Sequence, residues 1–127
     1  MKYIIRTHFD AAHKLLPPYE GPCCNLHGHT WNVDFVFRFS KEDCDVTGMC
    51  VDFKILKRFI NDILPDHQYL NQTFPGEPPT AENLAAIFYK QIRERLKHNR
   101  KLSKIAIQNV VVWESTDCGV VFEDLDA

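Results

Sequence analysis

Between Trp31 and Phe39, apolar and polar side chains alternate almost without a break. One face of this segment is entirely apolar and the other is mostly polar: Trp31, Val33, Phe35, Phe37 and Phe39 against Asn32, Asp34 and Arg38. Successive side chains of a strand point to opposite faces of a sheet, so this period of two predicts a half-buried antiparallel strand. The rest of the chain must therefore supply elements that cover one face of a sheet.

Two segments have helical periodicity. The first begins after Asp52, a good N-cap, and ends at Pro65, which cannot continue a helix. Its apolar residues follow helical spacing: Phe53, Leu56, Ile60 and Ile63. The second begins after Thr80, also a good N-cap, and presents the apolar stripe Leu84, Ile87, Phe88, Ile92 and Leu96.

Strands are predicted at residues 2–9, 31–39, 104–114 and 119–124, with both helices between the second and the third strand. The order β-β-α-α-β-β indicates an α+β fold, a four-stranded antiparallel sheet with two helices packed on one face. At 127 residues the chain is expected to form a single domain, residues 1–127. The open edges of such a sheet favour assembly into a homo-oligomer.

Composition argues against several classes of partner. The net charge of −2 gives no electrostatic reason to expect binding to nucleic acid or to an anionic membrane. No apolar run approaches the roughly 20 residues of a membrane helix, and the N-terminus becomes polar too soon for a signal peptide. We therefore expect a cytoplasmic location, where the five cysteines would be free thiols.

The most informative motif is His27-Gly28-His29, which directly precedes the alternating strand. If that strand extends back to His27, both imidazoles project to the same side of the sheet. His13, at the end of the first strand, offers a third ring nitrogen. Three histidines without a fourth protein ligand are typical of an open, catalytic zinc site, so the motif predicts bound Zn²⁺. The alternative is a turn at the motif and a surface position for His13.

Cys23 lies four residues before His27, close enough for a metal to lower the pKa of its thiol and make it a base. Cys24 is the rival for this role. A cysteine that joined the histidines as a fourth ligand would instead give a closed site.

The carboxylates of Asp66 and Glu114 are further candidates for a role in catalysis or ligand binding. Asp66 and His67 place a carboxylate beside an imidazole in a short loop, and such a pair can relay protons. A solvated loop without a catalytic role explains these two residues equally well. Glu114 ends the third strand on an apolar face, where a carboxylate suits the N–H groups of a ligand. The alternative is that Glu114 only begins a turn.

Six segments, in order along the chain, resemble the 6-pyruvoyltetrahydropterin synthase and 6-carboxytetrahydropterin synthase family. They are residues 9–13 (FDAAH), 23–29 (CCNLHGH), 51–53 (VDF), 66–71 (DHQYLN), 79–83 (PTAEN) and 113–115 (WES). The resemblance implies the tunnelling fold and a homo-oligomer, a trimer or a hexamer, with active sites between neighbouring subunits. It also implies a small-molecule substrate, 7,8-dihydroneopterin triphosphate.

The resemblance also implies a role for each candidate residue. His13, His27 and His29 would bind Zn²⁺, and Cys23 would be the acid–base residue. Asp66 and His67 would complete proton transfer. Glu114 would hold the pyrimidine edge of the pterin, with Thr80 and Glu82 as further pocket residues, drawn from this subunit or a neighbour.

The spacing before the histidine pair separates the branches of the family. Three residues between Cys23 and His27 resemble the 6-carboxytetrahydropterin synthases of queuosine biosynthesis, which release acetaldehyde and triphosphate. The biopterin-forming branch typically has five. Pyruvoyl formation is thus one alternative, and a non-catalytic, zinc-stabilised binding module is another. If Cys24 is the working thiol, the spacing fits neither branch.

Overall fold

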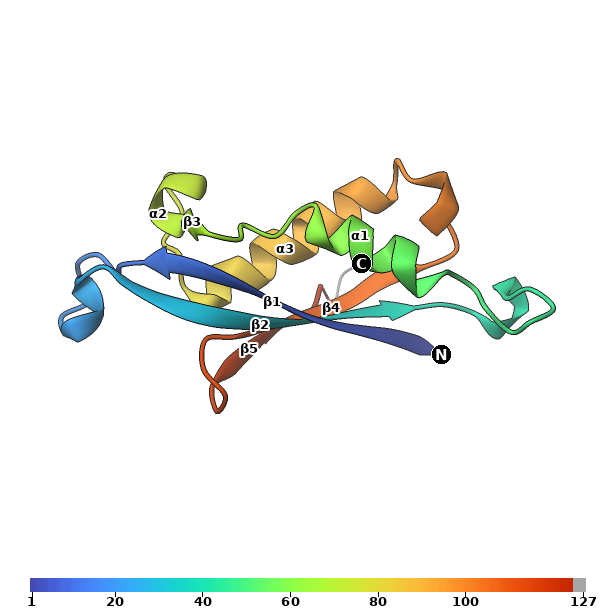
Figure 1. The fold of residues 1–127 in the computed structure, drawn as a ribbon, viewed down its shortest axis with the longest axis horizontal. Helices are drawn as coiled ribbons and strands as arrows, with labels where there is room; N and C mark the ends of the chain where they lie inside the picture. Colours follow the sequence, from blue (N-terminus) through green and yellow to red (C-terminus); the bar gives the residue numbers. More distant parts are fainter. Residues whose placement is uncertain (125–127) are drawn as a thin grey trace.

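A computed structural model describes residues 1–124, which form a five-stranded sheet in the order β3-β1-β2-β4-β5 (Figure 1). The strands are β1 (Lys2–His13), β2 (His27–Arg38), β3 (Gln68–Tyr69), β4 (Ala106–Trp113) and β5 (Gly119–Phe122). The four predicted strands and the α+β class are confirmed. β2 begins at His27, four residues earlier than the alternating pattern alone indicates.

The antiparallel pair β1–β2 forms the centre of the molecule and has one covered face. Its register places Ile5 opposite Phe35 and Phe9 opposite Trp31, and all four side chains are buried. Burying each such side chain contributes on the order of 1.5–3 kcal/mol. This face therefore supplies much of the driving force for folding and fixes the register of the two strands.

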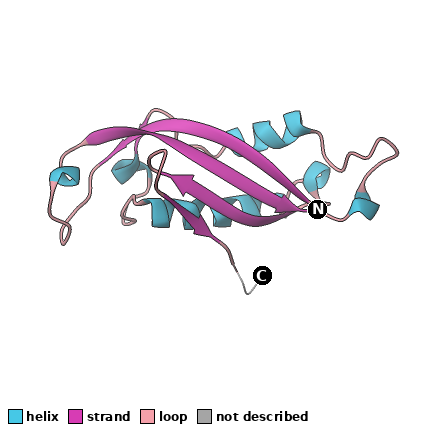
Figure 2. Ribbon diagram, turned by 90° about the horizontal axis from the view of Figure 1, so that it is seen from below, coloured by secondary structure: helices cyan, strands magenta, loops and turns pink. Residues whose placement is uncertain are grey.

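Helices cover that one face of the sheet (Figures 1 and 2). They are α1 (Phe53–Asn61), the single turn α2 (Leu70–Thr73) and α3 (Ala81–Leu96), with short 3-10 turns at η1 (Pro22–Cys24), η2 (Lys41–Asp43) and η3 (Arg100–Leu102). Both predicted N-caps are confirmed. The Asp52 side chain accepts a hydrogen bond from the Lys54 amide at 2.8 Å, and the Thr80 hydroxyl accepts one from the Asn83 amide at 3.2 Å.

The prediction of four wholly antiparallel strands and two helices needs correction in detail. β3 is a fifth strand and runs parallel to β1, pairing with Ala11 and Ala12, and α2 follows it directly. Two residues are too few to show a period, so the sequence pattern contained no sign of this strand. Its position comes from tertiary contacts, because the His67 amide donates to the Asp10 carbonyl at 2.6 Å.

Both edges of the sheet stay partly open. β3 covers only the end of β1, so residues 2–9 have no strand partner on that side among the described residues. At the opposite edge, β5 pairs with β4 alone. Among residues 1–124, no helix is long and apolar enough to cross a membrane.

Candidate active site

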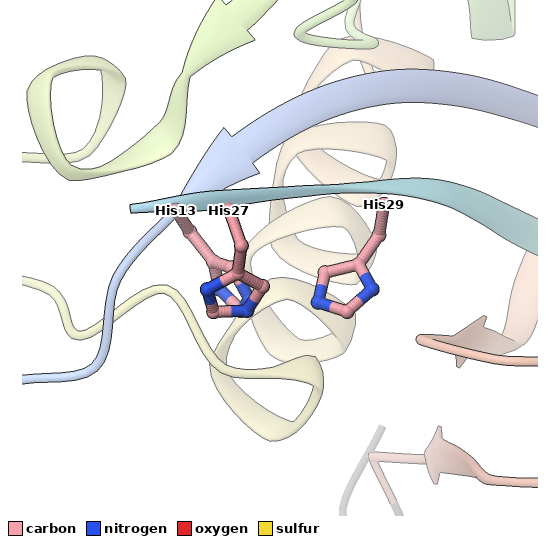
Figure 3. A group of neighbouring side chains, drawn as sticks. All are labelled: His13, His27 and His29. Carbon is pink, nitrogen blue, oxygen red and sulfur yellow. The ribbon is translucent and has the colours of Figure 1, made fainter. Parts of the chain in front are cut away.

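His13, His27 and His29 converge below the ends of β1 and β2 (Figure 3). His13 lies opposite His27, and His29 lies opposite Ala11, so the three rings share the covered face of the sheet. Ring centroids are 4.6 Å apart for His13 and His27, 5.0 Å for His13 and His29, and 4.8 Å for His27 and His29. One nitrogen from each ring lies within 4.8 Å of the other two.

Backbone carbonyls orient two of the rings. Nδ1 of His13 lies 2.7 Å from the Pro79 carbonyl oxygen, and Nδ1 of His27 lies 2.7 Å from the Asn25 carbonyl oxygen. A carbonyl only accepts, so each Nδ1 must carry the proton and donate it. Nε2 is then the unprotonated nitrogen with a free lone pair, as is common for histidines that bind metals.

The three Nε2 atoms are buried and have no hydrogen-bond partner. Burial is the main cause that lowers the pKa of His13 and of His29, although the Glu114 carboxylate opposes it. The three imidazoles, each with an unpartnered Nε2, form a donor set that fits a divalent ion such as Zn²⁺. Within residues 1–124 the group contains these histidines alone, so no thiolate closes it.

Glu114 lies beside the histidines. Its Oε1 is 3.8 Å from His29 Nε2, and its side chain keeps 38% of its surface exposed. The Glu114 amide donates to the Cys118 carbonyl at 3.2 Å, which begins the turn between β4 and β5. Glu114 therefore does begin a turn, and it also presents an accessible carboxylate next to the three rings.

Cys23 lies in η1 beside Tyr19, a residue that the sequence pattern did not indicate. The Tyr19 ring lies over Gly21, where an added Cβ would be 3.0 Å from Oη, and Gly21 has φ 143°, which favours glycine. A hydrogen bond with Cys23 is the main cause that raises the pKa of Tyr19, and the charge of Glu114 also contributes. The Cys23 thiol and the Tyr19 hydroxyl are thus neighbours in this loop.

Cys24 is oriented differently from Cys23. Its Sγ donates to the Tyr19 carbonyl oxygen at 3.1 Å, so this thiol is turned toward the backbone of its own loop. The arrangement favours Cys23 as the reactive thiol.

A hydrogen bond connects Asp66 and His67, with 2.8 Å between Asp66 Oδ2 and His67 Nδ1. The left-handed backbone of His67, with φ 58°, brings these neighbours together. The carboxylate also accepts from the Asp10 amide at 2.9 Å, the main cause that lowers the pKa of Asp66. The hydrogen bond to Asp66 raises the pKa of His67, whose side chain is 79% exposed. No described contact connects this pair with Cys23.

Among the described residues, no hydrogen bond or ion pair joins the side chain of Thr80 or Glu82 to the three histidines. The Thr80 hydroxyl caps α3, and Glu82 lies exposed in the first turn of that helix. The segment reaches the site through Pro79, whose carbonyl orients His13. A role for Thr80 and Glu82 in a ligand pocket therefore stays a prediction.

Residues 3–124 match the sequence profile of the family described as 6-pyruvoyl tetrahydropterin synthase. The chain belongs to this family. The resemblance seen in its six motifs is thereby confirmed.

Two relatives and one solved structure illustrate the range of the family. A 6-carboxy-5,6,7,8-tetrahydropterin synthase of Synechocystis is 37% identical over 91 residues, 68% of this chain and 70% of that protein. A dihydroneopterin monophosphate aldolase of Pyrococcus furiosus is 30% identical over 125 residues, 96% of each chain. The structure of Caenorhabditis elegans 6-pyruvoyl tetrahydropterin synthase has a TM-score of 0.78 at 22% identity, covering 98% of this chain and 95% of that one, and shows the shared fold.

Proposed function

We propose that this chain is a zinc-dependent 6-carboxy-5,6,7,8-tetrahydropterin synthase. It would convert 7,8-dihydroneopterin triphosphate to 6-carboxytetrahydropterin with release of acetaldehyde and triphosphate, in the cytoplasm and within queuosine biosynthesis. The observation that carries the proposal is the set of three buried, unpartnered Nε2 atoms beside the Glu114 carboxylate. Relatives named 6-carboxy-5,6,7,8-tetrahydropterin synthase support the choice of reaction, as does the three-residue spacing between Cys23 and His27.

The proposed metal ligands are His13, His27 and His29, held in place by two carbonyls and by Trp31. The Trp31 ring lies 5.0 Å from His13 and 5.2 Å from His29, measured between centroids, and is fully buried. When bound, zinc supplies Lewis acidity toward the oxygens of the substrate side chain. The rigid apolar support keeps the donor nitrogens in place when no ligand is bound.

The other side chains have separate tasks in this proposal. Glu114 accepts hydrogen bonds from the N–H groups on the pyrimidine edge of the pterin and so orients the ring. Cys23 takes up and returns a proton at the side-chain carbons, and the Tyr19 hydroxyl beside it stabilises the thiolate by donating a hydrogen bond.

Asp66 and His67 are proposed to serve a neighbouring subunit. The pair is exposed, and its hydrogen-bond network with Asp10 holds the imidazole in a fixed orientation. Because the sheet leaves both edges partly open, copies of the chain can associate edge to edge into a trimer or a hexamer. Such assembly would bring His67 of one subunit to Cys23 of another and complete a proton relay.

One experiment tests the reaction. Purified protein loaded with Zn²⁺ is incubated in parallel with dihydroneopterin triphosphate and dihydroneopterin monophosphate, and products are identified by mass. We expect the triphosphate to be consumed, with acetaldehyde and a carboxypterin formed. A diketo side chain without acetaldehyde would assign the chain to the pyruvoyl-forming branch.

A second candidate is an aldolase acting on the monophosphate. The relative of that name from Pyrococcus furiosus aligns with 96% of this chain, the fullest coverage among the relatives compared. Cleavage of the monophosphate alone in the same experiment would favour this candidate over the synthase.

Removal of the metal distinguishes two hypotheses: an enzyme with a catalytic zinc ion, and a binding module whose fold zinc stabilises. We expect chelation to abolish turnover while far-UV circular dichroism and the thermal unfolding transition persist, because a continuous apolar core holds the fold without the metal. Added Zn²⁺ should restore activity. Loss of the folded signal on chelation would instead indicate a structural metal site.

A further inference from the structure

A second pair of cysteines lies at the other end of the sheet from the three histidines. Cys44 and Cys50 occupy the two ends of the turn that leads from β2 toward α1, in the blue-green to green part of the ribbon (Figure 1). Neither residue belongs to the site described above. Both thiols are free and half-buried.

The turn between them is a tight three-residue hairpin. The Asp45 amide donates to the Met49 carbonyl at 2.8 Å, and the Gly48 amide donates to the Asp45 carbonyl at 3.0 Å. Gly48 has φ 89°, the left-handed position that this type of hairpin requires. The Asp45 carboxylate also accepts from the amides of Thr47 at 2.8 Å and Met49 at 3.2 Å. The turn is thus held by four hydrogen bonds that involve its backbone.

This geometry sets Cys44 and Cys50 directly opposite each other. Asp45 and Met49 are the hydrogen-bonded pair of the hairpin, so the next residues outward form a non-hydrogen-bonded pair, with Cα atoms about 4.5 Å apart in regular geometry. Disulfides join Cα atoms at roughly 4.4–6.8 Å. The hairpin therefore positions the two thiols for a bond with little movement of the backbone.

The two thiols differ in their surroundings. Cys50 packs against the hydrophobic core, and its amide donates to the Tyr3 hydroxyl at 3.1 Å. Burial, followed by the charge of the adjacent Cys44, raises the pKa of the Cys50 thiol, and the nearby ammonium of Lys104 partly offsets this. The Cys44 thiol donates to the Ser40 carbonyl at 3.9 Å, and among the described residues that pack against the core Cys50 is included and Cys44 is not. We therefore assign the first attack on a reagent to Cys44.

We propose that Cys44 and Cys50 form a redox-active dithiol that exchanges with small-molecule disulfides such as oxidised glutathione. The Cys44 thiolate attacks one sulfur of the reagent, its S–S bond breaks, and the first glutathione leaves as a thiol with the proton that Cys44 gave up. The Cys50 thiolate then attacks Cys44 Sγ and displaces the second glutathione, which takes the proton from Cys50. The protein loses two hydrogen atoms and the reagent is reduced to two thiols.

The second step, the attack of Cys50 on the mixed disulfide at Cys44, distinguishes this pair from the other cysteines. The hairpin holds Cys50 beside the mixed disulfide, so the reaction is intramolecular and outcompetes the return of free glutathione. Cys118 is exposed, and no hydrogen bond to another thiol is seen for it within the described residues, so it should stop at a mixed disulfide. The proposal does not depend on the reaction catalysed at the histidine site.

The test uses the full chain as purified, treated with excess oxidised glutathione, quenched with acid and digested with trypsin. Trypsin cleaves after Lys41 and Lys54, so both thiols lie in one peptide, residues 42–54, which holds no other cysteine. We expect this peptide to lose the mass of two hydrogen atoms and to regain it on reduction. The variants Cys44→Ser and Cys50→Ser should instead carry one stable glutathione on the remaining thiol.

Cys118→Ser is the matched control, and its 42–54 peptide should oxidise at the rate of the wild type. The proposal is overturned if the wild-type peptide stays reduced, or carries glutathione without forming the internal bond, while Cys118 reacts in the same sample. Because peptide mapping of the wild type decides the question, the test stands even if a serine variant folds poorly.

Discussion

Replacing His27 with alanine should reduce zinc affinity by at least ~100-fold and turnover in proportion to the metal lost. The variant removes one of three nitrogens from an open site, whereas loss of even an outer hydrogen-bond partner of a ligand costs ~10–100-fold. His27 suits this test because its ring is half-buried at the start of β2 and its Nδ1 contacts only the Asn25 carbonyl of its own loop. Metal content by elemental analysis and affinity by competition with a chelating dye measure the effect.

His8→Ala is the matched control for this variant. His8 lies in β1, as His13 does, but on the opposite, exposed face of the sheet. It should retain full metal content and turnover. Equal zinc affinity in His27→Ala and His8→Ala would contradict the assignment of the three-histidine site.

Replacing Cys23 with alanine should lower kcat by ~10²–10⁴-fold and leave zinc content unchanged, because a positioned acid–base group contributes about that factor. The structure supports this separation of roles, since Cys23 is hydrogen-bonded to Tyr19 and does not join the histidine group. Turnover of dihydroneopterin triphosphate and metal content, measured on the same preparation, test both halves of the prediction.

Cys24→Ala serves as the comparison, because the two thiols are adjacent but point differently. The Cys24 thiol donates to the Tyr19 carbonyl of its own loop, so its loss should change kcat by less than ~10-fold, about the effect of a lost neutral hydrogen bond. If Cys24→Ala is inactive and Cys23→Ala is active, the thiol assignment is wrong.

Much of the fold was predictable because it depends on local periodicity. The alternation from Trp31 onward, the N-caps Asp52 and Thr80, and the stripe of the second helix each act within a few residues of chain. β3 escaped prediction because only its pairing with Ala11 and Ala12 makes Gln68 and Tyr69 a strand. A two-residue segment has no period of its own.

The grouping of the three histidines was predictable, but the orientation of their ring nitrogens was not. The period of two placed His27 and His29 on one side as soon as the strand was extended back, and His13 followed from its neighbouring strand. Which ring nitrogen faces inward was not predictable, because it depends on the carbonyls of Pro79 and Asn25. Those carbonyls come from loops whose paths no local pattern specifies.

The sequence alone determined four of the five described strands, the two longer helices, their covered faces and the three candidate ligand histidines, because periodicity and capping are properties of neighbouring residues. The tertiary structure alone decided which distant groups meet: Glu114 with His29, and Asp66 with Asp10. Such meetings depend on loop closure and strand register over the whole chain. The orientation of a donor lone pair or a thiol is therefore a result of the complete fold.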